Sequence, residues 1–364
     1  MVSPLSRRQD TIMRKAISPH EKLTATLRFL ASGRSYEDLK FTTLISPQAL
    51  GVIIPETCEA ISKVLEKNYF KSEVIIQPGL YQTLIRAIDG KHIDIIPPSG
   101  SGSYYYNYEC PHSMVLLAIV NAKHQFIVCD FGVKGGISDR GILQTTELYD
   151  KLQKNELEIP SHEPIKNSSE ILPYVFIADD AFALRTHMMK PFRHSDLTSK
   201  NKKIYNYRVC RDRRFVENAF GILVSRFRIF KTPINVEPNN IDRIVLASCA
   251  LHNYLMSNST NSYTYAECFD RENMKQGCIT PGSTSNDSNM KHLDQRYLGN
   301  SPNAAKIVRE KYVHYFNKME ACLVDRGFRD AIYDMKSARY VPFMPCCKGK
   351  RKQLTIEDTM NPEG

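Results

Sequence analysis

The stretch Tyr174-Val-Phe-Ile-Ala-Asp-Asp180 decides the fold that this sequence predicts. Its first five residues form an apolar run without alternation, which is typical of a strand covered on both faces. Two aspartates follow directly, at the carboxyl end of the strand, where open α/β sheets place their ligands. The stretch therefore predicts an α/β domain with an acidic site beside a buried strand.

The segments on either side of this stretch complete the predicted sheet. Leu84 to Ile96, Met114 to Val120 and Gln125 to Gly132 are strand-like, and the short turn between the last two predicts a hairpin. Helices are expected from Ile142 to Leu152 and from Arg208 to Phe230. The order of three strands, a helix, a buried strand and a helix predicts a mixed α/β sheet flanked by helices. It matches the core of the RNase H-like fold.

The N-terminal residues predict three short helices. Gly33 is a stop signal after the first helix, Ser35 begins a capping box, and Ser46 with its following proline begins the third helix. Pro55 is expected to kink or divide that third helix. Short helices joined by tight turns fit a helix-turn-helix module, and they fit a generic helical bundle equally well. We interpret residues 1–70 as a small all-α, helix-turn-helix-like region.

The rest of the chain divides by composition. Residues 84–256 hold the predicted sheet domain, and residues 257–301 are rich in Ser, Asn, Thr and Gly, which predicts a flexible insert. Residues 302–364 are expected to form a C-terminal helix and a basic tail. Residues 348–352, Lys-Gly-Lys-Arg-Lys, read either as a nuclear import signal or as a solvated tail.

The charge and the cysteines limit the class of protein. The net charge of +10 favours a polyanionic partner, although charge alone fits a basic protein without one about equally well. Ten cysteines lie without a paired framework, which indicates reduced thiols in an intracellular protein. No apolar run approaches the ~18 residues of a membrane span, so we expect no membrane association.

Three acidic residues stand where burial disfavours a charge unless a cation compensates it. Asp89 interrupts an apolar strand, Asp179 follows the buried strand, and Glu217 lies on the long helix among residues that should pack on the sheet. Phosphodiester cleavage by two metals needs carboxylates that converge on ions about 3.5–4 Å apart. Carboxylate oxygens select hard ions such as Mg²⁺ or Mn²⁺.

Each acid also has an ordinary structural interpretation. Asp89 could cap a turn with Gly90, Asp179 could begin a helix at Ala181, and Glu217 could pair with a neighbouring arginine, Arg213 or Arg214. Their order on strand, strand end and helix favours a site. His92, close to Asp89, is expected to be a packed strand residue rather than a ligand.

Asp139 is a fourth acidic candidate. It lies in Gly135-Gly-Ile-Ser-Asp-Arg-Gly141, whose glycines allow close approach of the backbone to a phosphate or a metal. The helix expected from Ile142 would add a favourable dipole for phosphate. An ordinary Ser-Asp helix cap explains the same residues equally well.

Several stretches, in order, resemble the DDE domain of PIF/Harbinger transposases and of host nucleases derived from them. They are Ala87–Ile93, Asn107–Tyr108, Pro111–Ser113, Gly135–Gly141, Ile177–Leu184, Tyr205–Arg208, Arg213–Leu223 and Leu251–Tyr254. The resemblance implies a catalytic and metal-binding triad of Asp89, Asp179 and Glu217, with Asp139 as a less certain metal ligand. Asp180 falls at a position that varies in the family.

The same resemblance implies an activity and partners. We expect a DNA endonuclease or transposase that uses two Mg²⁺ or Mn²⁺ ions, with hydrolysis and strand transfer at DNA ends as its reactions. Arg208, Arg211, Arg213 and Arg214 are expected to contact DNA phosphates. A Myb-like helper protein, a homodimer and a nuclear location, with the cytoplasm as an additional one, are also implied. The alternative is a silent DNA-binding or scaffold protein that retains the transposase fold.

Overall fold

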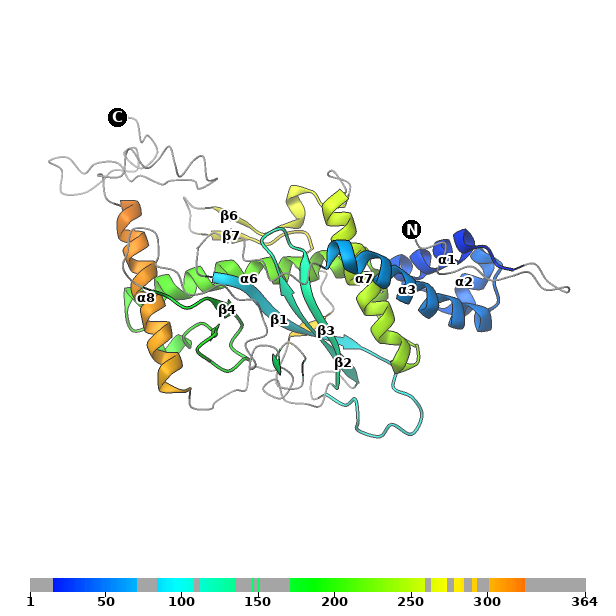
Figure 1. Cartoon of the computed structure of the whole chain (residues 1–364), viewed down its shortest axis with the longest axis horizontal. Coiled ribbons are helices and arrows are strands. Elements are labelled where there is room, and N and C mark those ends of the chain that lie inside the picture. The colour runs from blue at the N-terminus through cyan, green and yellow to red at the C-terminus, as the bar shows by residue number, and fades with distance from the viewer. Residues whose placement is uncertain are drawn as a thin grey trace, which may run out of the picture.

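A mixed sheet forms the centre of the protein (Figure 1). This computed structural model describes residues 16–70, 84–107, 112–134, 146, 149–150, 171–258, 263–273, 278–284, 290–292 and 301–324. The main strands are β1 Leu84–Asp94, β2 Ser113–Val120, β3 Phe126–Lys134, β4 Val175–Ile177 and β5 Met188–Met189. Their order is β3-β2-β1-β4-β5, with β1 to β3 antiparallel and with β4 and β5 parallel to β1. The predicted hairpin and the predicted mixed α/β architecture are confirmed.

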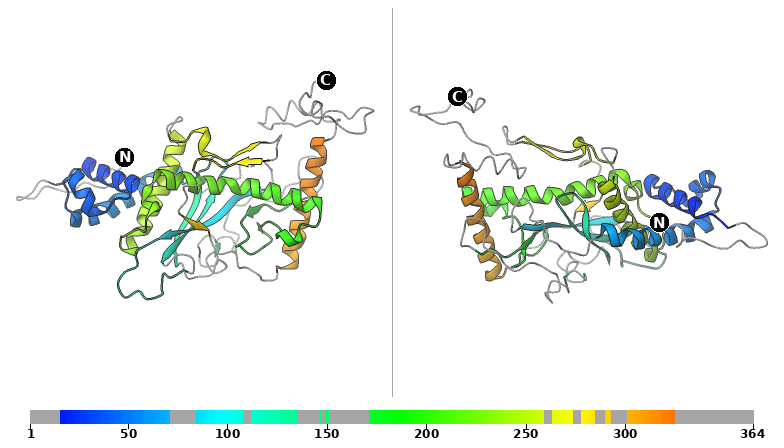
Figure 2. Two further views of the ribbon diagram at one scale, coloured as in Figure 1. Left: turned by 180° about the vertical axis from the view of Figure 1, so that it is seen from behind. Right: turned by 45° about the horizontal axis from the view of Figure 1, so that its top comes forward.

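Two long helices cover one face of this sheet. Figure 2 shows α6, Lys200–Arg226, running along that face, with α7, Pro238–Asn258, beside its C-terminal end. A third helix, α8, Asn303–Val324, crosses α6 at the other end and buries Tyr312 and Phe316 against it. The alternation of side chains along a strand therefore gives β1 two different environments. Ala87 and Ile93 pack with α6, whereas Ile88 packs in a separate cluster on the opposite face.

The N-terminal segment forms three helices as predicted: α1 Pro19–Ser32, α2 Tyr36–Thr43 and α3 Pro47–Tyr69. Gly33 ends α1 in the left-handed conformation, and Ser35 and Ser46 cap the following helices. A complete capping box of Ser18 and Glu21 begins α1. Pro55, which is expected to kink or divide α3, does not divide it: α3 continues through this proline as one helix of 23 residues.

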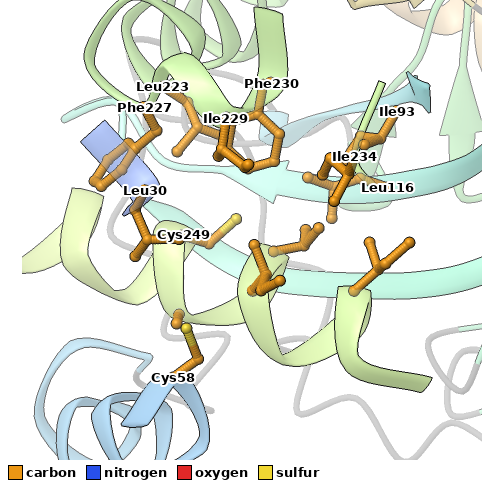
Figure 3. Packing of buried hydrophobic residues seen from close by; sticks show 14 of the residues in the cluster. Leu30, Cys58, Ile93, Leu116, Leu223, Phe227, Ile229, Phe230, Ile234 and Cys249 are labelled. Carbon is orange, nitrogen blue, oxygen red and sulfur yellow. The ribbon is translucent and has the colours of Figure 1, made fainter. Parts of the chain in front are cut away.

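These helices share the core of the sheet domain. Figure 3 shows Leu30 of α1 and Cys58 of α3 beside Cys249 of α7, close to Leu223 and Phe227 at the end of α6. A Cβ built on Gly33 would lie 2.7 Å from the carbonyl oxygen of Arg228, in the short 3-10 helix η3 Arg228–Lys231. The N-terminal helices thus pack directly on the region after α6, and an independent all-α domain is not confirmed.

The segment predicted as a flexible insert carries ordered structure in its described parts. It contains η4 Ala266–Cys268, the antiparallel pair β6 Arg271–Asn273 and β7 Cys278–Thr280, and β8 Lys291–His292. The last of these strands pairs with β1 at Lys91 and His92. Cys268 and Met290 are buried. Single buried residues spaced through a polar sequence give no periodic signal, which is why the sequence analysis missed them.

Two further predictions differ from the structure. No helix begins at Ala181, because the chain turns there and continues through β5 to a single 3-10 turn, η2 His194–Asp196. The long helix begins at Lys200 and not at Arg208, and it ends at Arg226, where η3 follows. The helix predicted from Ile142 to Leu152 lies almost wholly outside the described residues. No helix in the described part of the chain is long and apolar enough to cross a membrane.

Candidate active site

The pairing of two parallel strands brings the two predicted aspartates together. β4 pairs with β1 as far as Ile177 opposite Ala87. Asp89 and Asp179 each lie two residues beyond this last pair, so the parallel register carries both to the same place. Both are buried, with Asp89 at 0% and Asp179 at 2% exposure. Burial raises the pKa of Asp179, and the negative charge of Asp89 contributes to this shift.

Helix α6 carries the third acid, Glu217, and Arg213 one turn earlier links it to Asp179. The Nη2 atom of Arg213 lies 2.9 Å from Oε1 of Glu217 and 4.0 Å from Oδ2 of Asp179. Residues four apart lie on the same face of a helix, so this pair follows directly from the helical repeat. The structural interpretation of Glu217 as the partner of Arg213 is therefore confirmed. The same arginine also joins Glu217 to the aspartates.

Lys91 is a second cation of the cluster, and the sequence analysis missed it. Its Nζ lies 3.6 Å from Oδ2 of Asp89 and 6.0 Å from the centre of the Phe220 ring. Burial lowers the pKa of Lys91, and the charge of Asp89 opposes that shift. The available signal was the strand period, because residues 89 and 91 lie on the same face of β1.

Local hydrogen bonds occupy one oxygen of each aspartate. Oδ1 of Asp89 accepts the N–H of Gly90 at 2.9 Å, and Oδ1 of Asp179 accepts the N–H of Ala181 at 2.9 Å. Asp89 and Asp179 therefore make the hydrogen bonds expected of a turn at Gly90 and of a helix start at Ala181. However, Asp89 lies inside a strand, and no helix begins at Ala181. Oδ2 of Asp89 is buried without a hydrogen-bond partner in the described ranges. This buried oxygen faces the ammonium of Lys91 at 3.6 Å without a hydrogen bond, which leaves it capacity to bind a further cation.

Within the described residues, the cluster contains fewer cations than carboxylates. Burial raises the pKa of Asp179 to about 6, and the charge of Asp89 adds to this shift although Arg213 opposes it. In the part of the protein that the structure describes, the three carboxylates form ion pairs with two cations, Lys91 and Arg213. An additional cation would relieve the remaining repulsion between the acids.

Asp180 is directed to a different partner. Its Oδ1 lies 2.9 Å from Nζ of Lys190, whose ammonium also donates to the carbonyl oxygen of Asp180. The side chain of Asp180 is 39% exposed, unlike that of its buried neighbour. The structure therefore separates the two aspartates of this pair and brings only Asp179 to the cluster. Asp139, the fourth candidate, lies outside the described residues.

The donor set fits a hard divalent ion in its chemistry, because it consists of carboxylate oxygens with one buried oxygen unpartnered. It is not assembled as a metal site. Among the residues that the structure describes, no three His, Cys, Asp or Glu side chains are arranged to hold a metal ion. The guanidinium of Arg213 lies between Glu217 and Asp179 instead.

His92 confirms its expected role as a packed strand residue. Its Nδ1 lies 2.9 Å from Oγ of Ser113, and Nδ2 of Asn107 lies 3.1 Å from the same ring. All three residues are buried. His92 has the strand parity of Ile88, so this network lies on the face opposite to the acidic cluster.

Comparison with known proteins agrees with this arrangement. Residues 88–253 match a family model described as DDE superfamily endonuclease. All three acids of the cluster lie in the matched range. The chain carries a DDE superfamily endonuclease domain. Endonucleases of this superfamily generally use divalent metal ions, in keeping with the donor type of the cluster.

Relatives of known sequence extend the similarity beyond the DDE domain. The chain is 24% identical over 256 residues to the proteins named "Putative nuclease HARBI1" of Bos taurus and of Homo sapiens. The corresponding protein of Rattus norvegicus is 22% identical over the same length. These matches cover 66% of this chain and 68% of each relative. No solved structure matches the chain.

The predicted DNA-binding arginines of the DDE domain differ in exposure. Arg208 is buried and Arg213 takes part in the acidic cluster, whereas Arg211 and Arg214 are half-buried. The charges of Arg211, Arg208 and Arg214 act on Asp212 between them, although burial still raises the pKa of Asp212 to about 7. Arg211 and Arg214 are therefore the better placed of the four to contact a phosphate.

The motif Leu251–Tyr254 has a structural role in the DDE domain. His252 and Asn253 are buried in the interior of α7. The side chain of Asn253 binds both the N–H and the carbonyl group of Phe126 on β3, at 2.8 and 2.6 Å. These residues join α7 to the sheet and lie away from the acids.

Proposed function

We propose that this protein is a divalent-metal-dependent DNA endonuclease, with Asp89, Asp179 and Glu217 as its catalytic carboxylates. One observation carries the proposal. Acids from β1, from the end of β4 and from α6 meet around Arg213, inside the range that matches the DDE superfamily endonuclease family. Two buried acids and one half-buried acid, drawn from three separate elements, are costly to hold together unless cations compensate them.

The strand order supports the RNase H-like fold as part of this proposal. An antiparallel unit of β1 to β3 is extended by β4 and β5, which run parallel to β1, and α6 covers one face. In this arrangement the central strand and its parallel neighbour hold Asp89 and Asp179 rigidly. The helix holds Glu217 at the more open side, where its side chain is 34% exposed.

The three carboxylates would hold the ions, and Lys91 and Phe220 would set the charge and the packing around them. Bound divalent ions supply charge stabilisation for the attacking and leaving oxygens of an in-line displacement at phosphorus. Backbone N–H groups fix the Oδ1 atoms of Asp89 and Asp179, so these two residues would hold the ions with their remaining carboxylate oxygens. Lys91 is buried beside Asp89 and offsets part of the charge of that carboxylate. Phe220 closes the cluster toward the core.

We propose that DNA contacts the exposed side of α6. This helix contains eight basic residues (Lys200, Lys202, Lys203, Arg208, Arg211, Arg213, Arg214 and Arg226) and two acidic ones, Asp212 and Glu217. The described N-terminal residues 16–70 contain six basic and six acidic residues, an even balance that does not favour binding of phosphates. The basic helix that carries Glu217 is the better electrostatic surface for DNA.

A cleavage assay with charge-neutral variants tests the proposal. Purified wild-type protein with Mn²⁺ and duplex DNA should give cleavage that EDTA prevents. Asp89→Asn, Asp179→Asn and Glu217→Gln should each lower the rate by about 10³-fold or more, because each removes charge that holds the ions. Asp242→Asn, on α7 outside the cluster, is the matched control and should cleave like the wild type. Full activity of any triad variant would remove that residue from the proposal.

The silent DNA-binding protein is a second candidate, and Arg213 is the observation that favours it. A guanidinium that permanently occupied the acids would leave a folded site without turnover. DNA binding that weakens with salt, together with no cleavage in Mn²⁺ or Mg²⁺ on any DNA end, would support this alternative. The Myb-like helper, the homodimer, strand transfer and the nuclear location remain predictions from the family resemblance.

A further inference from the structure

Two protein cations, Lys91 and Arg213, lie within the acidic cluster. Arg213 approaches both Glu217 and Asp179, and Lys91 approaches Asp89, so each carboxylate has a protein cation close by. Isolated charges buried in this way would cost several kcal/mol each, and pairing offsets that cost. The two cations thus offset part of the repulsion among the three acids.

The two cations are held very differently. The side chain of Lys91 is 3% exposed and lies between Asp89 and the Phe220 ring, on a strand that is paired on both sides. The side chain of Arg213 is 15% exposed and faces Glu217, which is 34% exposed. Only Arg213 therefore has an open side through which it could move.

Arg213 is also bound incompletely. Its Nη2 makes one hydrogen bond, to Glu217, while the 4.0 Å distance to Asp179 is too long for another. Its Nε is buried and has no hydrogen-bond partner in the described part of the chain. A guanidinium with five N–H donors usually makes paired bonds to a carboxylate. This loose arrangement is weaker than the bidentate pair that an arginine forms in a permanent structural role.

We propose that Arg213 is an internal counter-cation that divalent ions displace, so that this residue sets the metal affinity of the site. The inference rests on the proposed function. Arg213 is a positioning residue: it holds Glu217 and Asp179 apart from the ions until the ions take its place. Removing its charge should therefore strengthen metal binding, whereas removal of a residue that merely helps to build the site would weaken it.

Calorimetric titration of Mn²⁺ into the full chain without DNA tests this competition. The proteins are the wild type, Arg213→Gln, Arg213→Lys and Arg243→Gln. Arg243 is the matched control, because it pairs with Glu59 at 3.4 Å on the α3–α7 side of the protein and its loss changes the net charge equally. We expect Mn²⁺ to bind Arg213→Gln about tenfold more tightly than the wild type. Arg213→Lys should lie between them, and Arg243→Gln should match the wild type.

Thermal unfolding gives a second readout that does not need activity. In EDTA, Arg213→Gln should melt below Arg243→Gln, because its acids repel one another without a counter-cation. Saturating Mn²⁺ should raise the melting temperature of Arg213→Gln by more than that of the wild type. A cooperative transition of Arg213→Gln in EDTA shows that this variant is folded. A melting temperature below that of Arg243→Gln is the effect expected from repulsion among its acids.

The outcomes separate the inference from the proposed function. Tighter binding by Arg213→Gln, including binding that appears only in this variant, supports the inference. Equal or weaker binding by Arg213→Gln while the wild type binds overturns the inference and leaves the proposed function intact. Absence of binding in every protein overturns both, since removal of the competing charge should have exposed the carboxylates.

Discussion

Gly221 of α6 lies directly against the backbone of Thr284, in the segment between β7 and β8. A Cβ at Gly221 would lie 2.9 Å from the carbonyl oxygen of Thr284 and 3.3 Å from its carbonyl carbon. Thr284 is buried, and its Oγ1 donates a hydrogen bond to the carbonyl oxygen of Cys268 at 2.6 Å. This contact lies one helical turn after Glu217, and β8 pairs with β1 two residues after Asp89. The segment therefore contacts α6 and β1, two of the three elements that hold the acids.

Gly221→Ala should destabilise the protein, because the added methyl group meets a backbone that is held in place. We expect the free energy of unfolding to fall by about 1–3 kcal/mol, the usual cost of overpacking. Urea denaturation followed by circular dichroism measures this value. Gly51→Ala in α3 is the control, because its nearest neighbour is Cε2 of Tyr36 at an ordinary 3.7 Å. That variant should gain about 0.5–1 kcal/mol from helix propensity, and equal effects of both substitutions would contradict the contact.

Asn253→Leu should destabilise the junction of α7 with the sheet. The Asn253 side chain binds the N–H and carbonyl groups of Phe126 and also the carbonyl oxygen of Tyr69. A buried backbone group without a partner costs about 1–3 kcal/mol, so the expected loss is roughly 2–4 kcal/mol. Chemical denaturation is the measurement, with the exposed Asn258→Ala as control. A loss below about 0.5 kcal/mol for Asn253→Leu would show that water replaces these bonds.

Acid should destabilise the protein through His252. Its Nε2 donates to the carbonyl oxygen of His124 and its Nδ1 accepts from the Tyr263 hydroxyl, so both ring nitrogens are satisfied in the neutral form. Burial lowers the pKa of His252 to about 4, although the bond to His124 opposes this shift.

The sign follows from a folded-state pKa that lies below the unfolded value of 6.5. The contribution of His252 to stability is complete above pH 6.5 and is lost as the pH falls toward 4, because only the unfolded chain binds the proton readily. The loss is on the order of 3 kcal/mol. Denaturation of the wild type and of His252→Gln between pH 7.5 and 4.5 measures it. Parallel pH profiles for the two proteins would exclude His252 as the cause.

Metal binding should weaken below about pH 6 through Asp179. Burial, together with the charge of Asp89, raises the pKa of Asp179 to about 6. A proton and a metal ion compete for the same carboxylate, so affinity should be constant above this pH. Below it, affinity should fall by roughly tenfold per pH unit. Titration calorimetry with Mn²⁺ from pH 5 to 7.5 measures the profile, and constant affinity down to pH 5 would refute a role for Asp179 as ligand.

Much of the fold could be read from the sequence where a local pattern was complete. The apolar run Tyr174–Ala178 and the hairpin before it predicted the sheet correctly, because apolar runs and turn residues act over a few neighbours. Ser46 and Gly33 marked helix ends for the same local reason. Local patterns do not show which apolar residues of α1 are buried, since Leu30 is fully buried and Leu27 is 39% exposed. The buried face of α1 is chosen by α3 and η3, not by α1 itself.

The candidate site divides in the same way. The sequence by itself determined that acids would stand on a strand, at a strand end and on a helix, since those positions depend on residue type and local period. Only the tertiary structure decided that Asp89 and Asp179 meet, because that depends on the parallel register of β1 with β4, which pairs Ala87 with Ile177, ninety residues later. It also decided that Lys91 and Arg213 neutralise them and that Asp180 turns to Lys190. Charges act through space over a few ångströms, so the partners of a buried acid are fixed by packing and not by distance along the chain.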